Sequence, residues 1–560
     1  MAKTSAERRR NRTLGTFLVA MMACAALSQT YVQIFAAGKT LETARKGNNY
    51  IVSRTDTARR GAIFSADDKV LAQSNDTFEL SISYDKVPKS DSFFMALSEA
   101  SGLPAIELEL SARSGGKSKT WSQKINQERE RKIQQIKVDW RADGLSLRRV
   151  PTREYPFSDV ADALIGQLVE GKPATGLESS QNGMLSGKDG KREGLVDRYG
   201  AFLPMRMTSS DIKAVHGQDL VLTIDSGLQV AATSALKRAV EQHKADQGVV
   251  VVIDPRTGDI LAMASWVNNG VSQSENGFNP AVMARFEPGS TFKILTLAEG
   301  IDSGSVNPHT VIHCGGSIAV GRVNRVSCAH GGHGAIDAEM AIAESCNVSA
   351  ATWARQIGRD QFIGFMENAG LFTRTSIGLP GEIPGRYNEN DGGKLIQLAN
   401  MGFGQALNVT PIGLCAAFAS LGNNGVCPEP RLIKKIGSKK VPISAGRRLF
   451  KSETCDEVLT MMRSVFENEH GTAHKLRIPG YAIGGKTGTA EKLNGRTREG
   501  HKEYVSNFVG FVPAQNPKAV VLVMIDNPSD GQYYGGTVAG PVFKSVAESL
   551  ISRFNLPKTE

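Results

Sequence analysis

The N-terminal part of the chain joins a cationic segment to a long apolar one. An uncharged run, residues 14–37, follows five basic side chains, which are Lys3, Arg8, Arg9, Arg10 and Arg12. About 20 helical residues cross a bilayer core, whereas the apolar part of a cleavable signal peptide has roughly 7–15. The pattern therefore predicts a cytoplasmic tail over 1–13 and a retained transmembrane anchor over 14–37. The remaining chain is expected outside the cytoplasm, because the denser cationic cluster stays inside.

Beyond the anchor, the hydrophobic pattern divides the chain at about residue 215. Residues 38–215 contain short β-like alternations, charged turns and one helical stretch near 124–137. From residue 216 onward, longer apolar runs are separated by turn residues. These patterns predict two domains, 38–215 and 216–560.

The second domain begins with alternating strand and helix patterns. A strand is predicted over 217–225, a helix over 228–243, and a hairpin of buried strands over 248–265. Near the C-terminus, FVGFVPA and AVVLVMID predict two further strands, and VFKSVAESLISRF predicts a closing helix. Strands at both ends of a domain with helices between them indicate an α+β fold whose sheet is assembled from distant segments.

Composition adds little beyond size and charge. The 560 residues are 41% hydrophobic and 22% charged, which is ordinary for two or three folded domains. The net charge is +10, but acidic residues accompany the basic ones and no long Lys/Arg block follows residue 12. Nucleic-acid binding is not predicted, since it needs a basic stripe; a positive surface facing anionic lipid or polymer is favoured.

The most specific chemical signal is RFEPGSTFKIL, in which Ser290 and Lys293 stand three residues apart. On a helix this spacing places both side chains on one face, where a lysine amine can act as base towards a serine hydroxyl. This pair alone is a common coincidence. Two further triplets follow in order, Ser345-Cys346-Asn347 and Lys486-Thr487-Gly488. Ser-x-x-Lys, Ser-x-Asn and Lys-Thr-Gly in this order are the signature of penicillin-recognising serine enzymes.

The chain resembles the class B penicillin-binding proteins, membrane-anchored D,D-transpeptidases that cross-link peptidoglycan. The resemblance implies an α+β architecture: the anchor, an elongated β-rich pedestal (dimerisation-type) domain over 38–215, and a transpeptidase domain over 216–560. That domain would have a serine β-lactamase-like fold, with a central antiparallel sheet flanked by helices. MGFGQALNVTP and FVGFVPA are similar to segments of the family's catalytic domain.

Three segments are similar to the family's pedestal motifs: RRGAIFSADDKVLA, REYP and TGLESSQNGMLSGKDG. Ser65 and Ala66 stand where Asp-Arg is usual, which affects pedestal contacts and leaves the chemistry unaffected. Arg60 and Glu178 are expected to hold segments of the pedestal together by an ion pair.

The resemblance also implies a role for each motif residue. Ser290 would attack the carbonyl between the last two D-alanines of a stem peptide, and Lys293 would take its proton. Ser345 would relay a proton towards the leaving nitrogen. Asn347 would hold Lys293 and the substrate amide.

The Lys-Thr-Gly segment is expected to bind the substrate's terminal carboxylate. Lys486 would attract the carboxylate and lower the pKa of Lys293, while Thr487 and Thr489, which flank Gly488, would donate hydroxyl hydrogen bonds. The backbone N–H groups of Ser290 and Thr489 would form the oxyanion hole; one such donor typically contributes ~3 kcal/mol of transition-state stabilisation.

The resemblance is closer to the division (septal) type than to the elongation type, because of the compact pedestal, the GLE motif, GFGQ..NVTP and GKTGTAEK..YVSNFVGFVPA. A D,D-carboxypeptidase and a β-lactam-binding sensor remain alternatives. Expected partners are stem peptides, the lipid-linked precursor, β-lactams, the membrane, and divisome or elongation proteins. No glycan-polymerising domain precedes the pedestal, so a polytopic polymerase of the SEDS class is expected to supply the strands. The expected location is the plasma (inner) membrane, single-pass, and catalysis is expected to need no cofactor.

Five metal-ligand or thiol residues lie between the helix bearing Ser290 and the Ser-x-Asn turn: Cys314, Cys328, His330, His333 and Cys346. Three cysteines and one histidine form a standard structural zinc set, which would be Cys314, Cys328, His333 and Cys346. His333 is favoured over His330 because Gly331-Gly332 lets the chain fold back. Cys346 is the middle residue of its triplet, so a metal there would brace the catalytic turn from behind.

Two other interpretations of these cysteines stay open. A Cys314–Cys328 disulfide would close a 15-residue loop, which contributes ~3 kcal/mol in the chain-entropy picture, and thiols outside the cytoplasm can oxidise. Alternatively, all of them are free thiols in a loop.

Overall fold

The computed structural model describes residues 5–31, 51–114, 116–195, 212–268, 277–329, 331–388, 394–496 and 502–559. Helix α1 spans Ser5–Tyr31, and its segment Arg12–Tyr31 is long and apolar enough to cross a membrane. The end of the predicted anchor, 32–37, lies outside the described residues. The finding supports an N-terminal membrane anchor.

By their internal contacts, residues 5–559 form two compact units. The first comprises the segments before residue 60 together with 76–150 and 187–216, and the second comprises 60–75, 151–186 and the chain from 217. The second unit thus contains two segments of the predicted pedestal region in addition to the whole predicted transpeptidase domain. These two segments include most of each of the three family-like pedestal motifs; Arg59 and residues 187–190, at the ends of two motifs, fall in the first unit.

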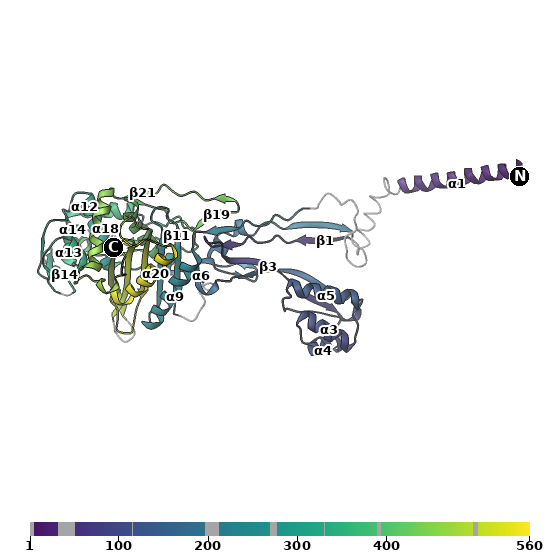
Figure 1. The fold of residues 1–560 in the computed structure, drawn as a ribbon, viewed down its shortest axis with the longest axis horizontal. Helices are drawn as coiled ribbons and strands as arrows, with labels where there is room; N and C mark the ends of the chain where they lie inside the picture. The colour runs from purple at the N-terminus through teal and green to yellow at the C-terminus, as the bar shows by residue number, and fades with distance from the viewer. Residues whose placement is uncertain are drawn as a thin grey trace. The chain divides into compact units, whose positions relative to one another are not determined.

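The first unit contains a small helical lobe with its own core (Figure 1). Its helices are α3 (Asp91–Ser101), α4 (Ala105–Arg113) and α5 (Gln127–Asp139). Strands of the unit include β1 (Ile51–Asp56), which pairs antiparallel with β8 (Gly190–Leu195), and β4 (Ser118–Thr120). Phe93, Leu108 and Ile133 are buried in the lobe's core. The sequence pattern predicted only α5, so α3 and α4 are helices that it missed.

The second unit is built on a five-stranded sheet in the order β11-β10-β24-β23-β22, with every neighbouring pair antiparallel. The strands are β10 (Gln247–Ile253), β11 (Ile260–Val267), β22 (Gly484–Arg496), β23 (Lys502–Val512) and β24 (Ala519–Asp526). The predicted hairpin and the two C-terminal strands are confirmed. The sheet is assembled from both ends of the domain, as the apolar pattern indicated. The predicted strand over 217–225 is shorter, β9 (Leu220–Leu222), and joins another sheet, between β19 (Ile433–Ile436) and β2 (Ile63–Phe64).

Helices pack on this sheet and also form a separate helical region beside it. The long helices α9 (Ser226–Gln242) and α20 (Gly540–Arg553) contact each other and the sheet, and both were predicted. The remaining helices include α12 (Lys293–Asp302), α13 (Ala338–Ala343), α14 (Asn347–Ile357), α16 (Leu395–Met401), α17 (Pro411–Ala419) and α18 (Ser452–Glu467). Figure 1 shows α12, α13, α14 and α18 gathered together. The antiparallel sheet flanked by helices confirms the predicted fold class.

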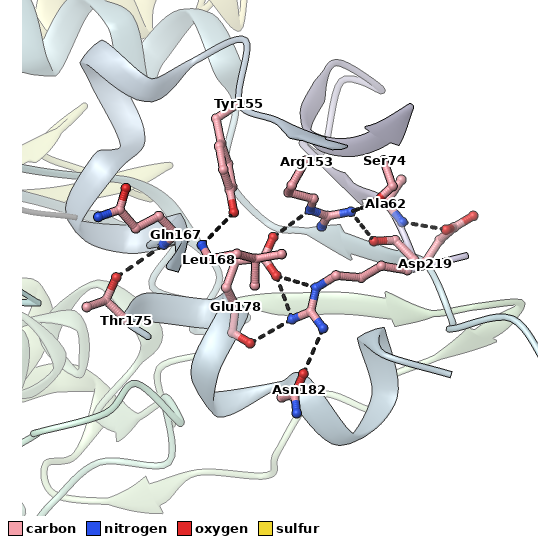
Figure 2. A network of polar contacts seen from close by, with 12 residues as sticks. Ala62, Ser74, Arg153, Tyr155, Gln167, Leu168, Thr175, Glu178, Asn182 and Asp219 are labelled. Atoms are coloured by element: carbon pink, nitrogen blue, oxygen red, sulfur yellow. Dashed lines mark hydrogen bonds and ion pairs between the residues drawn. The ribbon is translucent and has the colours of Figure 1, made fainter. Parts of the chain in front are cut away.

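A buried glutamate joins the segments that carry the three pedestal motifs (Figure 2). Glu178, in α7 (Gly176–Ser180), is fully buried and accepts hydrogen bonds from the Nε atoms of Arg60 and Arg153 at 2.6 and 2.7 Å. Arg60 also donates to Asn182 and Arg153 to the carbonyl of Gly61. The predicted Arg60–Glu178 ion pair is confirmed. Arg153, from the REYP motif, is a second partner that was not predicted.

Replacing Glu178 by glutamine is expected to lower the free energy of unfolding by about 3 kcal/mol. The substitution leaves two nearly buried guanidinium groups without a counter-charge, and an uncompensated buried charge is strongly destabilising. Urea denaturation of the detergent-solubilised protein measures the change. Glu467→Gln is the matched control, because Glu467 pairs with Arg463 at the surface of α18, where the expected change is below about 0.5 kcal/mol. Equal effects of the two substitutions would contradict the assigned role.

Candidate active site

The nucleophile candidate Ser290 lies in a short 3-10 turn, Gly289–Phe292, directly before α12. Gly289 has φ +56°, and a Cβ there would lie 2.8 Å from the carbonyl oxygen of Thr489. Glycine is therefore required at this position for two reasons: the left-handed backbone and the close approach of the turn to β22. Lys293 begins α12 directly after this turn, so Ser290 and Lys293 stand three residues apart on consecutive helical turns.

The Ser-x-Asn turn brings Ser345 against Lys293. The Lys293 amine donates to the Ser345 carbonyl oxygen at 2.5 Å and lies 3.1 Å from the Ser345 hydroxyl oxygen. Ser345 has φ +63°, a conformation that a non-glycine residue adopts at a cost. The amide of Asn347 donates to the carbonyl of Ser327 at 2.8 Å, so in this structure it binds the segment before the turn.

The Lys-Thr-Gly segment lies at the start of β22, the edge strand of the sheet. Lys486 is fully buried, and its amine donates to the carbonyl and hydroxyl oxygens of Thr487 at 3.2 and 3.3 Å. Gly488 faces Asn507 on β23, and a Cβ at Gly488 would lie 2.4 Å from the Asn507 side chain. The glycine is therefore needed for the approach of the asparagine.

Asn507 connects the nucleophile turn to the sheet. Its amide donates to the carbonyl of Pro288 at 3.0 Å, and its oxygen accepts from the Thr291 hydroxyl at 3.0 Å. YVSNFVGFVPA is a family-like segment, but no role was predicted for Asn507 within it. An asparagine within an otherwise apolar strand was the signal that could have identified it.

Burial controls the charge of both lysines. It lowers the pKa of Lys293 to about 7, while the neighbouring thiols of Cys346 and Cys328 act in the opposite direction. Burial also lowers the pKa of Lys486 well below its usual value, and repulsion from Lys293 adds to this effect. Lys486 was expected to be the cause of a lowered Lys293 pKa; in the structure burial is the principal cause. A neutral Lys293 amine is thus available near neutral pH.

Two glutamates near the nucleophile occupy different environments. Glu287 is buried, and its carboxylate accepts from the backbone N–H of Ala406 at 2.9 Å. Burial raises the pKa of Glu287 to about 7. Glu344 is half-buried at the cleft. Glu287 therefore fastens the segment that includes Gln405 to the nucleophile turn.

These elements enclose a cleft of about 410 Å³. Its lining contains most of the predicted site residues, which are Ser290, Ser345, Asn347, Thr487 and Thr489. Lys293 and Lys486 lie buried next to it. Further lining residues that the sequence analysis gave no role are Arg325, Asn400, Phe403, Gln405, Thr472 and Tyr534. Thr472 hydrogen-bonds Thr487, 15 positions away in sequence, a contact that no local motif predicts. Tyr534 packs on its sequence neighbour Tyr533, whose ring stacks on Tyr504 of β23.

The insertion between α12 and the Ser-x-Asn turn brings four predicted metal ligands together. Cys314 Sγ lies 3.7 Å from Cys328 Sγ and 3.3 Å from His333 Nδ1, and Cys328 Sγ lies 3.8 Å from Cys346 Sγ. All four donor atoms lie within 4.8 Å of one another. The thiols are free, so the structure forms no Cys314–Cys328 disulfide. His330 lies outside the described residues.

Comparison with known proteins places this site in a family. A model of the penicillin binding protein transpeptidase domain matches residues 248–548, and one of the penicillin-binding protein dimerisation domain matches residues 55–222. The probable peptidoglycan D,D-transpeptidase PenA of Neisseria meningitidis is 30% identical over 556 residues, covering 96% of this chain and 92% of that protein. The peptidoglycan D,D-transpeptidase FtsI of Escherichia coli is 30% identical over 477 residues, 82% and 77% of the two chains.

Solved structures agree. Penicillin binding protein 3 of Mycobacterium tuberculosis, in complex with aztreonam, matches with a TM-score of 0.67 and 26% identity, covering 90% of this chain and 98% of that chain. A peptidoglycan synthetase from Bifidobacterium adolescentis shares the fold, with a TM-score of 0.72 at 23% identity over 91% and 98% of the two chains. The chain therefore belongs to the class B penicillin-binding proteins, the peptidoglycan D,D-transpeptidases.

Proposed function

We propose that Ser290 is the nucleophile of this transpeptidase and Lys293 its base. The observation that carries the proposal is the convergence of three separate motifs on one cleft, next to a buried lysine whose pKa is lowered to about 7. A neutral amine can take the serine proton as the hydroxyl attacks the carbonyl between the last two D-alanines. The Ser345 hydroxyl, 3.1 Å from the Lys293 amine, would then pass a proton to the leaving D-alanine nitrogen.

The substrate would be held along β22. In this proposal the terminal carboxylate is bound by Lys486, Thr487 and Thr489. Gly488 has no side chain, which leaves room for Asn507 between the strand and the nucleophile turn. The N–H groups of Ser290 and Thr489 form the oxyanion hole, and Asn347 binds the substrate amide on the acyl side. An amine of a second stem peptide then attacks the acyl-enzyme and forms the cross-link.

We place this activity in septal wall synthesis, at the outer face of the plasma membrane. The GLE, GFGQ..NVTP and GKTGTAEK..YVSNFVGFVPA segments support the septal assignment, since they are similar to those of the division type. The cationic residues that precede the apolar run of α1 support a cytoplasmic tail. A polymerase of the SEDS class is the proposed source of the glycan strands. A fluorescent fusion is expected to concentrate at the division site; a purely lateral distribution would favour the elongation type.

We also propose that Cys314, Cys328, His333 and Cys346 hold a structural zinc ion. In a tetrahedral site with Zn–S bonds of about 2.3 Å, two sulfurs lie about 3.8 Å apart. The Cys314–Cys328 and Cys328–Cys346 sulfur–sulfur distances, 3.7 and 3.8 Å, fit this value. Zinc would supply no chemistry to the reaction. Cys328 directly follows Ser327 in sequence and Cys346 directly precedes Asn347, so the ion would fix both residues of the Ser327–Asn347 contact.

Product analysis tests transpeptidation directly. The full-length protein is incubated with lipid-linked precursor and a separate glycan polymerase, and muramidase digests are analysed by mass spectrometry. Cross-linked dimers with released D-alanine are expected, and enzyme previously acylated by penicillin is the control. Tetrapeptide monomers without dimers would identify a carboxypeptidase instead, and unchanged pentapeptides would identify a penicillin-binding sensor.

A further inference from the structure

One wall of the active-site cleft comes from the insertion that contains the cysteines. Its hairpin consists of β13 (Ser317–Val320) and β14 (Asn324–Ser327), and Arg325, Val326 and Ser327 of β14 line the cleft. Successive side chains of a strand point to opposite faces. Val326 is buried in the core, whereas Arg325 and Ser327 are exposed. Arg325 is thus an exposed residue of this strand in the lining of the cleft.

The hairpin holds Arg325 in a defined place. The Arg325 guanidinium donates to the hydroxyl of Ser317 on the facing strand at 2.6 Å. β14 contacts α14 and α16, and Cys328, which follows the strand, belongs to the cysteine–histidine cluster. The Ser327 carbonyl accepts from Asn347, the first residue of α14. These contacts anchor the strand, while the Arg325 side chain is exposed.

Arg325 supplies a positive charge at one end of the cleft. Among the described lining residues it is the only arginine or lysine; the other ionisable side chains are His333, Glu344 and Tyr534. Lys486 lies buried beside Thr487, at the end proposed to bind the terminal carboxylate. Arg325 is instead two residues from the carbonyl that binds Asn347, the residue proposed to bind the amide on the acyl side. A guanidinium is suited to planar carboxylates, which it binds through two N–H groups.

We propose that Arg325 is a specificity-determining residue that binds a second carboxylate of the donor peptide, on the acyl side of the scissile bond. This inference rests on the proposed function. The carboxylate has two sources in stem peptides: the side chain of the diamino residue, or the free α-carboxylate of the glutamyl residue. Both would meet the same guanidinium, which belongs to an exposed residue.

Two penicillins that differ by one carboxylate provide the test. Carbenicillin is benzylpenicillin with a carboxylate added on the acyl side chain. In competition with a fluorescent penicillin, Arg325→Gln is expected to lower the second-order acylation constant of carbenicillin about 5-fold and that of benzylpenicillin less than 2-fold. Arg325→Lys should fall between wild type and Arg325→Gln. The difference should shrink at 1 M salt, where the Debye length is about 3 Å.

Arg322→Gln is the matched control, since Arg322 is exposed in the turn of the same hairpin and does not line the cleft. It should leave the ratio of the two constants unchanged. Retained acylation by benzylpenicillin shows that Arg325→Gln is folded. Equal loss with both penicillins, or no loss with either, would overturn the proposal. Wild-type protein that neither penicillin acylates would refute the proposed function itself.

Synthetic donor pentapeptides distinguish the two carboxylate sources. One pair has or lacks the carboxylate on the diamino side chain; the other has a free or amidated glutamyl α-carboxylate. The wild type is expected to prefer the free acid in one pair, and Arg325→Gln to lose that preference. The absence of a preference in both pairs would overturn the proposal, as would a preference that Arg325→Gln retains.

Discussion

Ser290→Ala is expected to abolish covalent labelling by a fluorescent penicillin, by at least about 10⁴-fold in the acylation rate. Without the hydroxyl, no acyl-enzyme can form, and residual binding in the cleft is reversible. The loss of one nucleophile in a serine enzyme removes most of its rate enhancement, as measured in other serine hydrolases. Labelling of detergent-solubilised protein, followed by denaturing electrophoresis, measures the effect, because only a covalent adduct survives denaturation.

Ser327→Ala serves as the matched control for this experiment. Ser327 lines the same cleft with an exposed side chain, but its contact to Asn347 uses the backbone carbonyl, which the substitution keeps. Labelling is expected within about 3-fold of wild type. Thermal unfolding of both variants near the wild-type temperature would show that the loss in Ser290→Ala is chemical. Labelling that persists in Ser290→Ala would remove Ser290 from the role of nucleophile.

The core of the fold could be predicted from the sequence because its strands are apolar throughout. β10, β23 and β24 are buried almost along their whole length, so their apolar runs are visible without any knowledge of their partners. The helices of the lobe in the first unit were harder to predict from the sequence. α3 begins at the Ser90 cap and ends at Gly102 with φ +76°, both readable signals, yet its hydrophobic face is short and was taken for β-like alternation.

The catalytic motifs could be predicted because each is local in sequence, whereas their surroundings are not. Asn507 reaches Pro288 across more than 200 residues, and Thr472 reaches Thr487 from the segment after α18. Such contacts follow from sheet register and helix packing, which a single sequence does not specify. For the same reason Lys486 was expected to lower the pKa of Lys293, whereas burial of Lys293 is the principal cause of the lowered pKa.

The cysteine–histidine cluster could be predicted in part: its residues could be named from the sequence, but their arrangement could not. Its residue types and spacing allowed zinc, a disulfide or free thiols, and only the fold decides which donor atoms meet. A disulfide would use two of the three thiols and leave Cys346 and His333 beside it. The observed arrangement instead places four donor atoms within 4.8 Å of one another, a spacing compatible with the proposed tetrahedral ion. The glycines of the insertion make this possible, for example Gly332, whose Cβ would lie 2.8 Å from the Cys314 carbonyl.

The purified protein is therefore expected to contain one equivalent of zinc, which Cys328→Ser loses. Loss of the ion should lower the free energy of unfolding by about 5 kcal/mol at a free zinc concentration about 10⁴-fold above the dissociation constant. Acylation by benzylpenicillin should fall about 10-fold at the same time. Cys328 adjoins Ser327 and Cys346 adjoins Asn347, the two residues of one hydrogen bond, and small displacements of catalytic groups are costly. Elemental analysis, thermal unfolding and labelling rates measure the three effects.

Cys455→Ser is the matched control, since Cys455 is a buried free thiol on α18 that is not among the four clustered ligands. It should retain the full equivalent of zinc and its labelling rate, although the loss of a buried thiol costs some stability. His333→Ala tests the fourth ligand, and should lose zinc as Cys328→Ser does. Chelation of the wild type should reproduce both losses, and added zinc should reverse them. Protein that contains no zinc when purified in its presence, with three thiols reacting freely at the cluster, would reject the metal site and leave the four side chains as a packing contact behind the catalytic turn.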